Sequence, residues 1–215
     1  MNNQTLSQEM VNTLKKLGSA TIYEAQGAVG ALNGDIKPID PNMRLVGRAL
    51  TVDIRPGDNL MIHYALANAK AGDVLVIDAK GFIEAGPWGD VLTEQALTMG
   101  LAGLVINGAV RDSSSIVENE FPIFCKGLSI KGTEKKQPGK INIPIVISGV
   151  QINSGDIIVG DRDGVVVVKA NEVNSVIQKA QQREEKENIF KAKIRNGATT
   201  VELLGLADSL KKLGL

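Results

Sequence analysis

The sequence predicts an α/β fold built around a sheet that is buried on both faces. Three times between residues 59 and 126, a helical stretch leads into a short and fully apolar strand. Such alternation is typical of βαβ crossovers, which place helices against a mostly parallel sheet. Beyond residue 140, glycines separate several β-branched runs, which predicts further short strands. We therefore expect an α/β domain with an added β-rich segment.

The first expected elements follow in chain order. Residues 5–17 and 21–30 carry apolar side chains at helical spacing, and the second stretch ends at glycine. Residues 43–59 predict a strand closed by the Pro56–Gly57 turn. The three helices are expected at residues 59–73, 90–100 and 112–120. The strands that follow them are expected at residues 74–78, 101–107 and 122–126.

The pattern changes after residue 130. Residues 131–140 form a polar loop with four lysines, a composition typical of a solvated surface. Short strands are expected around the stretches IPIVIS, VQI, DIIVGD and GVVVVK. The sequence GDRDG between the last two fits a turn better than a calcium loop, because its acids run straight into an apolar strand. Residues 171–195 predict a long charged helix, followed by a short apolar tail.

Length and composition narrow the class of protein. A chain of 215 residues supports one substantial core, and no long linker divides it, so we expect a single domain over residues 1–215. Within it we expect N-terminal helices in residues 1–30 and a C-terminal helical segment in residues 171–215. The 24 basic residues are balanced by 24 acidic ones and aromatics make up 3%, which disfavours nucleic acid as a partner. No apolar run reaches the roughly 18 residues of a membrane span, and the N-terminus lacks a signal-peptide core. We expect a cytoplasmic protein with no membrane partner.

Asp90 and the pair Arg111–Asp112 flank one apolar helix and strand unit. About ten residues of helix lead away and a strand returns, so both acids should lie at the same end of the sheet, where α/β folds bind ligands. Two carboxylates there suit Mg²⁺ or Mn²⁺, and an arginine suits a substrate carboxylate. A purely structural interpretation also stands: both acids as helix N-caps and Arg111 in a surface ion pair.

The turn before Asp90 has features of an anion site. Gly89 lets a ligand approach the backbone closely. At the start of the following helix, the N–H groups of Val91 and Leu92 could donate to a carboxylate or phosphate.

The D-x20-R-D arrangement resembles the signature of the RraA-like family, which includes the class II pyruvate aldolases that cleave 4-hydroxy-4-methyl-2-oxoglutarate and 4-carboxy-4-hydroxy-2-oxoadipate. The resemblance covers most of residues 18–205. It is carried by SATIYEAQG, GRALTV, AKAGDVLVID, GLAGLVINGAVRD, GLSIKGTEKKQPGKINIPI and GDIIVGDRDGVVVV. It implies a layered αββα sandwich with a long C-terminal helix, and the GTEKKQPGKINIPI loop resembles the carboxy-hydroxy-oxoadipate aldolases more than other branches.

The resemblance also implies roles for the site residues. Asp112 would be the direct ligand of Mg²⁺ or Mn²⁺, Asp90 would orient a metal-bound water, and Arg111 would hold the substrate and stabilise the enolate oxygen. The backbone amides from Gly89 to Leu92 would hold the pyruvyl carboxylate. Cleavage would give pyruvate and a 2-oxo acid through a metal-stabilised pyruvate enolate, with a metal-bound water or hydroxide as the base. Because loss of CO₂ from oxaloacetate gives the same enolate, oxaloacetate decarboxylase activity is expected too.

In the family, an acid from the C-terminal helix of a neighbouring subunit reaches this site. The stretch REEKE offers Glu184, Glu185 and Glu187, and alignment of the helix favours Glu187. The resemblance therefore implies a homotrimer or homohexamer. An alternative for each of these acids is a solvated place on a charged helix face.

The same family implies a second possible function. One branch resembles the protein inhibitor of ribonuclease E, is not catalytic, and acts by binding its partner. The resemblance implies that this branch lacks the first acid of the D-x20-R-D set, whereas the present sequence has Asp90 at that position. A methyltransferase is disfavoured, because no glycine-rich strand–turn–helix with a following ribose-binding acid opens the chain.

Three single residues have both structural and functional interpretations. Cys125, the only cysteine, fits a buried strand end better than a catalytic thiol. His63 lies in an apolar helical stretch, where packing is favoured over ligand binding. Trp88 precedes Gly89, and packing is favoured over a place in a pocket wall. The lysine-rich loop could also contribute positive potential near a dianionic substrate.

Overall fold

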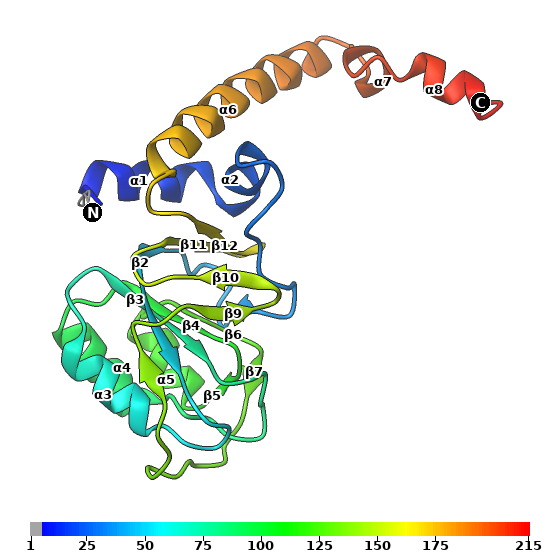
Figure 1. Ribbon diagram of the computed structural model, residues 1–215. Coiled ribbons are helices and arrows are strands. Elements are labelled where there is room, and N and C mark those ends of the chain that lie inside the picture. The colour runs from blue at the N-terminus through cyan, green and yellow to red at the C-terminus, as the bar shows by residue number, and fades with distance from the viewer. Residues whose placement is uncertain (1–5) are drawn as a thin grey trace.

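Four parallel strands form the centre of the structure, a computed structural model that describes residues 6–215. β2 pairs with β3, β3 with β4 and β4 with β6, all in parallel (Figure 1). These strands are β2 (Leu45–Asp53), β3 (Asp73–Asp78), β4 (Gly103–Ile106) and β6 (Ile123–Cys125). The helices that join them are α3 (Leu60–Asn68), α4 (Asp90–Thr98) and α5 (Ser113–Glu118). The three predicted helix and strand pairs are confirmed.

Antiparallel strands extend this core until the sheet nearly closes. Among the described residues the sheet has eight strands, and the added ones are β1 (Lys37–Pro38), β8 (Lys140–Ile141), β11 (Ile157–Asp161) and β12 (Gly164–Val168). β1 pairs with β6 at one edge, β12 pairs with β11 at the other, and β1 also lies near β12. A Cβ atom at Gly160 would lie 2.8 Å from the ring of Phe124. Glycine in β11 therefore leaves room for the aromatic ring that fills the sheet interior.

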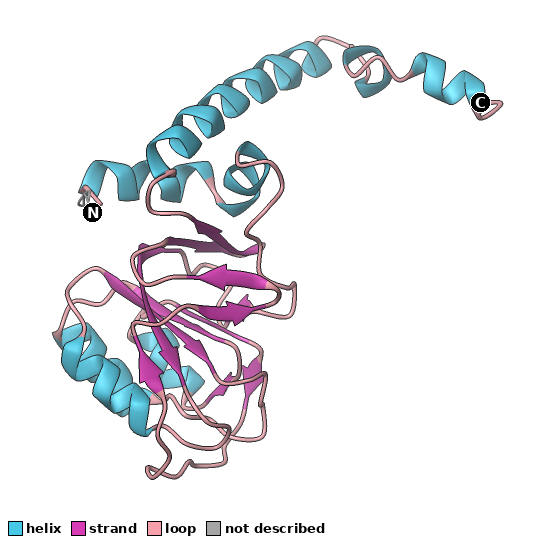
Figure 2. Cartoon of the chain, in the orientation of Figure 1, coloured by secondary structure: helices cyan, strands magenta, loops and turns pink. Residues whose placement is uncertain are grey.

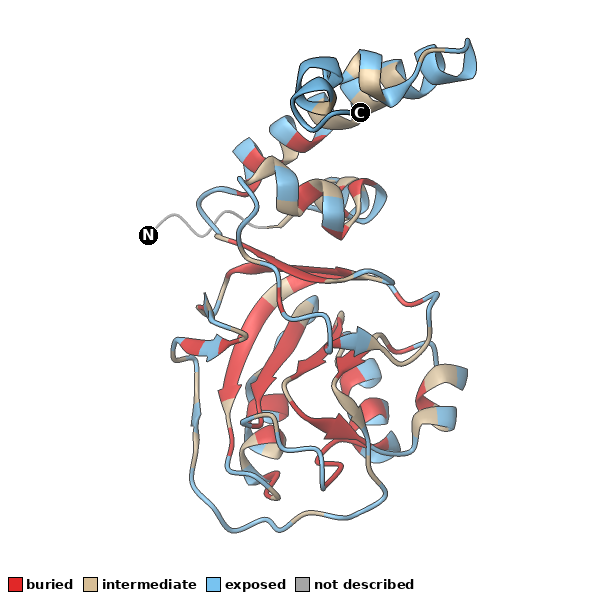
Figure 3. Cartoon of the chain, turned by 90° about the vertical axis from the view of Figure 1, so that its right-hand side faces the viewer, coloured by how far each residue is buried: buried red, intermediate tan, exposed pale blue. Residues whose placement is uncertain are grey.

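Hydrophobic clusters on both sides of the sheet define the layers. One cluster lies between a sheet face and α3, α4 and α5. A second lies between the sheet and the hairpin of β9 (Ile145–Ile147) and β10 (Val150–Ile152). A third packs α1 (Gln8–Leu17), α2 (Ser19–Ala25) and α6 (Val173–Arg195) onto β11 and β12. Figure 3 shows the strands as the most buried part of the chain. The α/β fold class and the layered αββα expectation are confirmed.

The two N-terminal helices differ from the prediction at their ends. α1 begins after the Ser7 cap, and the first residue of the expected helix lies outside the described residues. α2 ends at Ala25, so the expected continuation as far as Gly30 is wrong. Gly27 and Ala28 have φ values of 86° and 60°, and this left-handed backbone ends a right-handed helix.

The C-terminal segment extends away from the layered body (Figures 1 and 2). α6 confirms the predicted long helix, but the apolar tail forms two more helices, α7 (Thr200–Leu203) and α8 (Ala207–Lys212). Thr199 and Glu202 form a capping box that explains where α7 begins. Among the helices within residues 6–215, none has the length and apolar character needed to cross a membrane.

Candidate active site

The backbone of the loop before α4 is fixed by hydrogen bonds to three other segments. The Arg111 N–H donates to Trp88 O at 2.9 Å, the Gly86 N–H donates to Lys131 O at 2.9 Å, and Asn59 Nδ2 donates to Pro87 O at 3.0 Å. A Cβ atom at Gly86 would lie 2.6 Å from the carbonyl oxygen of Ser129, so glycine permits this close packing. The loop is therefore held rigidly against the residues that follow β5 (Ala109–Val110).

Asp90, Arg111 and Asp112 meet at this loop, as their spacing predicts. Asp112 Oδ2 accepts a hydrogen bond from the Asp90 backbone N–H at 3.3 Å and lies 3.3 Å from Arg111 Nε. A Cβ atom at Gly89 would come within 2.3 Å of the same oxygen. The absence of a side chain at Gly89 thus makes room for the Asp112 carboxylate, whereas the sequence suggested that a ligand would use this space.

The interpretation of both acids as helix N-caps is wrong for Asp90, and for Asp112 it holds for the position but not for a capping hydrogen bond. Gly89, not Asp90, is the N-cap of α4, and Asp90 Oδ1 accepts from the Val91 N–H at 2.7 Å within the first turn. Asp112 does occupy the N-cap position of α5, but its side chain makes no capping hydrogen bond. Its φ of 56° is left-handed, which is uncommon for a residue other than glycine and is often found at functional sites. The Asp112 carboxylate is directed to the α4 turn instead of its own helix.

A pocket of about 280 Å³ opens between this loop and two other segments. One wall consists of Gly86, Pro87, Arg111 and the range 89–92, and we call it the charged wall. The rest of the lining consists of Asn59 and His63 from the start of α3, together with Gly132, Thr133 and Lys135 from the lysine-rich loop, and we call it the α3 wall. The expectation that the lysine-rich loop lies near the site is confirmed by the position of Lys135.

A buried carboxylate that sequence analysis missed positions the α3 wall. The Asp58 side chain accepts from the backbone N–H groups of Leu60 at 2.9 Å, Lys136 at 2.7 Å and Gln137 at 3.0 Å. Burial by itself raises the pKa of Asp58, but these hydrogen bonds outweigh it and hold the pKa below its ordinary value. Asp58 follows the Pro56–Gly57 turn, where an acid is ordinarily exposed, so the local sequence carries no signal of this role.

Two polar atoms in the α3 wall have no partner. Asn59 Oδ1 and His63 Nε2 are both buried and accept or donate no hydrogen bond within the described part of the chain. Burial lowers the pKa of His63, and the positive charge of Lys135 lowers it further, so the imidazole is neutral near pH 7. Packing was the favoured interpretation for His63, but the structure places its side chain in the pocket wall.

Trp88 and Cys125 have structural roles. Trp88 is fully buried, stacks on Phe121 with ring centroids 6.0 Å apart, and donates from Nε1 to Thr93 Oγ1 at 2.8 Å. Cys125 is buried at the end of β6, where burial raises the pKa of its thiol to about 11. The favoured packing interpretation is confirmed for both residues.

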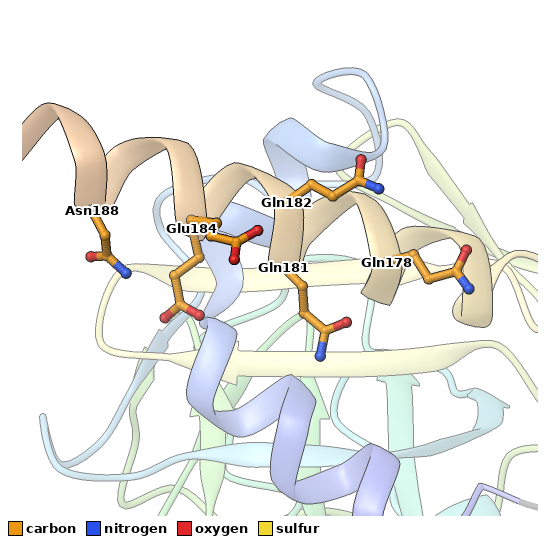
Figure 4. A pocket seen from close by; sticks show the side chains of 6 residues that line it. Gln178, Gln181, Gln182, Glu184 and Asn188 are labelled. Carbon is orange, nitrogen blue, oxygen red and sulfur yellow. The ribbon is translucent and has the colours of Figure 1, made fainter.

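Glu187 lies on α6, at the other end of the molecule from α4 (Figure 1). Its carboxylate pairs with Arg183 at 3.1 Å and Lys191 at 4.0 Å on the same helix. Glu184 and Glu185 line an open hollow of about 620 Å³ whose walls are side chains of α6 alone (Figure 4). Within one chain none of these acids reaches the pocket, so a role there stays a prediction that requires a second subunit.

The donor set at the loop suits a divalent ion that keeps most of its water. Asp112 is about one-third exposed and Asp90 is exposed at the first turn of α4, so both present hard oxygen atoms to solvent. Within residues 6–215, no group of three or more His, Cys, Asp and Glu side chains is placed to hold a metal ion. The family resemblance implies only Asp112 as a direct ligand, so its role as a metal ligand stays a prediction.

The fold and site define a member of the RraA-like family. The family model described as Aldolase/RraA matches residues 19–167, and the chain belongs to this family. This result confirms the family resemblance of the sequence.

Individual relatives carry different names. The chain is 39% identical over 176 residues to a protein of Halalkalibacterium halodurans named "Putative 4-hydroxy-4-methyl-2-oxoglutarate aldolase", covering 82% of this chain and 84% of the relative. A crystal structure of an uncharacterized protein from Pseudomonas syringae pv. tomato superposes with a TM-score of 0.79 at 29% identity, covering 90% and 95% of the two chains. The RNA-processing inhibitor RraA from Thermus thermophilis superposes with a TM-score of 0.64 at 27% identity, covering 70% and 92%. The family thus includes proteins named as an aldolase and as an inhibitor.

Proposed function

We propose that this protein is a class II pyruvate aldolase, a carbon–carbon lyase that cleaves a 4-hydroxy-2-oxo diacid into pyruvate and a 2-oxo acid. The observation that carries the proposal is the meeting of Asp90, Arg111 and Asp112 around the Gly89 turn. Substrates of this class are 4-hydroxy-4-methyl-2-oxoglutarate and 4-carboxy-4-hydroxy-2-oxoadipate. The name of the Halalkalibacterium relative supports the same activity.

The protein's own residues bind and orient the substrate. The Arg111 guanidinium provides a planar fork for the substrate's carboxylate and for the oxygen that becomes negative during cleavage. A substrate carboxylate at the turn replaces Asp112 Oδ2 as the acceptor of the Asp90 N–H, with the N–H groups of Gly89, Val91 and Leu92 alongside. A Mg²⁺ or Mn²⁺ ion, held by Asp112 with Asp90 beside it, supplies Lewis-acid polarisation of the 2-keto group when bound.

Cleavage breaks the bond between C3 and C4. The electron pair of this bond forms the enolate of pyruvate, the C4 hydroxyl becomes a carbonyl group, and its proton passes to a water that Asp90 orients. Protonation of the enolate at C3 then releases pyruvate. Loss of CO₂ from oxaloacetate forms the same enolate, so we propose oxaloacetate decarboxylase activity at the same site.

A coupled assay with lactate dehydrogenase measures pyruvate release from both kinds of substrate. We expect turnover that EDTA abolishes and that Mg²⁺ or Mn²⁺ restores. Turnover that persists in EDTA would contradict the metal-dependent class. No turnover of any 2-oxo acid would leave the inhibitor type as the better candidate, because the chain also resembles the RNA-processing inhibitor from Thermus.

We further propose that the active form is a cytoplasmic homotrimer or homohexamer in which Glu187 approaches the pocket of a neighbouring subunit. The C-terminal segment, which projects from the body, supports this arrangement (Figure 1). Light scattering should give three or six chains, and Glu187→Gln should lower turnover without changing this number. A monomer with full activity would contradict the arrangement.

A further inference from the structure

The α3 wall has a recognition element that the proposed mechanism does not use. Asn59 Oδ1 and His63 Nε2 are buried, unpaired within residues 6–215, and belong to residues that line the same pocket. Asn59 is the N-cap of α3 and His63 follows four residues later, a spacing that places both side chains on one helix face. Buried polar atoms ordinarily have partners, so two unpaired atoms on residues of the same pocket wall indicate a group that binds there.

The surrounding contacts fix the orientation of the Asn59 amide. Nδ2 donates to Pro87 O at 3.0 Å, which leaves Oδ1 as the unpaired atom and makes it an acceptor. The backbone N–H of Asn59 donates to Glu134 O at 3.0 Å, and its carbonyl oxygen accepts from the His63 N–H at 3.3 Å. The backbone bonds fix the position of the residue, and the side-chain amide cannot turn its donor into the pocket without losing the Pro87 contact.

These two atoms favour a hydroxyl group over a carboxylate. A carboxylate has only acceptor atoms and would be repelled by Asn59 Oδ1. A hydroxyl donates one hydrogen bond and accepts others, so it can donate to Asn59 Oδ1 while it accepts from His63 Nε2–H. Burial and the charge of Lys135 lower the pKa of His63, which favours a neutral imidazole with one N–H. The proposed arrangement uses the tautomer that carries this proton on Nε2.

We propose that Asn59 and His63 bind the C4 hydroxyl of the substrate and thereby select 4-hydroxy-2-oxo acids over 2-oxo acids that lack this hydroxyl. The proposal rests on the proposed aldolase function. The charged wall would hold the pyruvyl half, which all these substrates share, and the α3 wall would read the half that differs. Lys135, in the same wall, is placed for the remaining carboxylate.

The test compares two variants at position 63. His63→Leu removes the donor, whereas His63→Gln keeps an N–H that can reach the position of Nε2. We expect His63→Leu to lower kcat/KM for 4-hydroxy-4-methyl-2-oxoglutarate by about 10- to 100-fold, the usual effect of leaving a buried polar group unpaired. His63→Gln should recover most of this loss.

The dissociation constant of pyruvate, measured by calorimetric titration in the presence of Mg²⁺, provides the contrast. Pyruvate lacks the C4 hydroxyl, so its dissociation constant should change by less than about threefold in either variant. Tyr64→Leu is the matched control for disturbance of α3, because Tyr64 is exposed and lies outside the pocket lining.

Each outcome has one meaning. Wild-type protein that releases no pyruvate overturns the proposed function, and this inference falls with it. Active wild type with equal losses for the hydroxy acid and for pyruvate binding, or with no loss, overturns this inference alone. If His63→Leu fails to unfold cooperatively, Asn59→Ala, which removes the acceptor, is measured against the same two ligands. A loss for the hydroxy acid alone supports the inference, and equal losses or no loss overturn it.

Discussion

The two walls of the pocket are built in different ways. The charged wall presents Asp90 and Arg111, and the carboxylate of Asp112 contacts both of them at the Gly89 turn. These three residues lie at the ends of one helix and strand unit. The α3 wall depends on the buried Asp58, whose contact with Lys136 joins segments 78 residues apart. Charged residues at strand ends can therefore be predicted from their spacing in the sequence. A wall assembled by hydrogen bonds between distant segments cannot be predicted in this way.

Removing the Asp112 carboxylate, which lies against the charged wall, should have the largest effect. We expect Asp112→Ala to lower pyruvate release by about 10³-fold, because the variant loses both the proposed ion ligand and a preorganised charge. No capping hydrogen bond is lost, since the Asp112 side chain does not cap α5, so any fall in the unfolding temperature should come from the left-handed backbone alone.

Asp112→Asn serves as the matched control for backbone strain. Asparagine tolerates the left-handed φ of 56° at this position, whereas alanine is disfavoured there. Calorimetric titration with Mn²⁺ should show weaker binding in both variants. Unfolding of Asp112→Asn at room temperature would instead assign this residue to the stability of the fold.

Removing Asp58 tests whether the hydrogen bonds that it accepts hold the α3 wall in position. Asp58→Ala leaves three backbone N–H groups unpaired and should lower the free energy of unfolding by about 2–4 kcal/mol, measured with urea. KM should rise as well, because Lys135 and Thr133 lose their fixed position. An unchanged KM in the folded variant would contradict the positioning role.

The pH dependence of stability gives a second measure of Asp58. Its folded-state pKa is lowered, so its contribution is complete above the ordinary pKa of about 4 and is lost as the pH falls through the lowered value. Wild type should therefore lose stability below about pH 4 more steeply than Asp58→Ala. Parallel curves for the two proteins would mean that the carboxylate is not stabilised in the fold.

Adding one methyl group to the charged wall should have a smaller effect. Gly89→Ala places a Cβ atom 2.3 Å from Asp112 Oδ2, so the carboxylate must move. We expect activity to fall by about 10- to 100-fold, because small displacements of catalytic groups are amplified in rate. Gly34→Ala is the control, since a Cβ atom at Gly34 meets nothing within 4 Å. Equal activities in the two variants would show that this contact is not needed.

Lys135 should have the smallest effect of these changes. Lys135→Gln removes a positive charge from the α3 wall and should raise KM for dianionic substrates by about three- to tenfold, with kcat nearly constant. The effect should shrink with added salt. Lys136→Gln is the control, because Lys136 pairs with Glu134 and does not line the pocket. The same rise in KM for both variants would indicate general attraction by the loop rather than a contact.

Much of the fold follows from local patterns. The alternation of helices with apolar strands from residue 59 to 126 predicted the parallel core, because helical and strand periodicities differ and the strands are buried on both faces. The errors fall at element ends. α2 ends early at Gly27 and Ala28, whose left-handed backbone no periodicity reveals, and the tail after α6 forms helices where only apolar character was recognised.

The sequence by itself determined the charged wall. A helix leading out and a strand leading back must bring Asp90 to Arg111 and Asp112, because rise per residue and connection length leave little choice. Only the tertiary structure decided how these groups are used: Asp112 turns from its own helix to the Gly89 turn, and Asp58 fixes the lysine-rich loop opposite. The α3 wall, with unpaired atoms of Asn59 and His63, depends on contacts between distant segments, and such contacts leave no pattern along the chain.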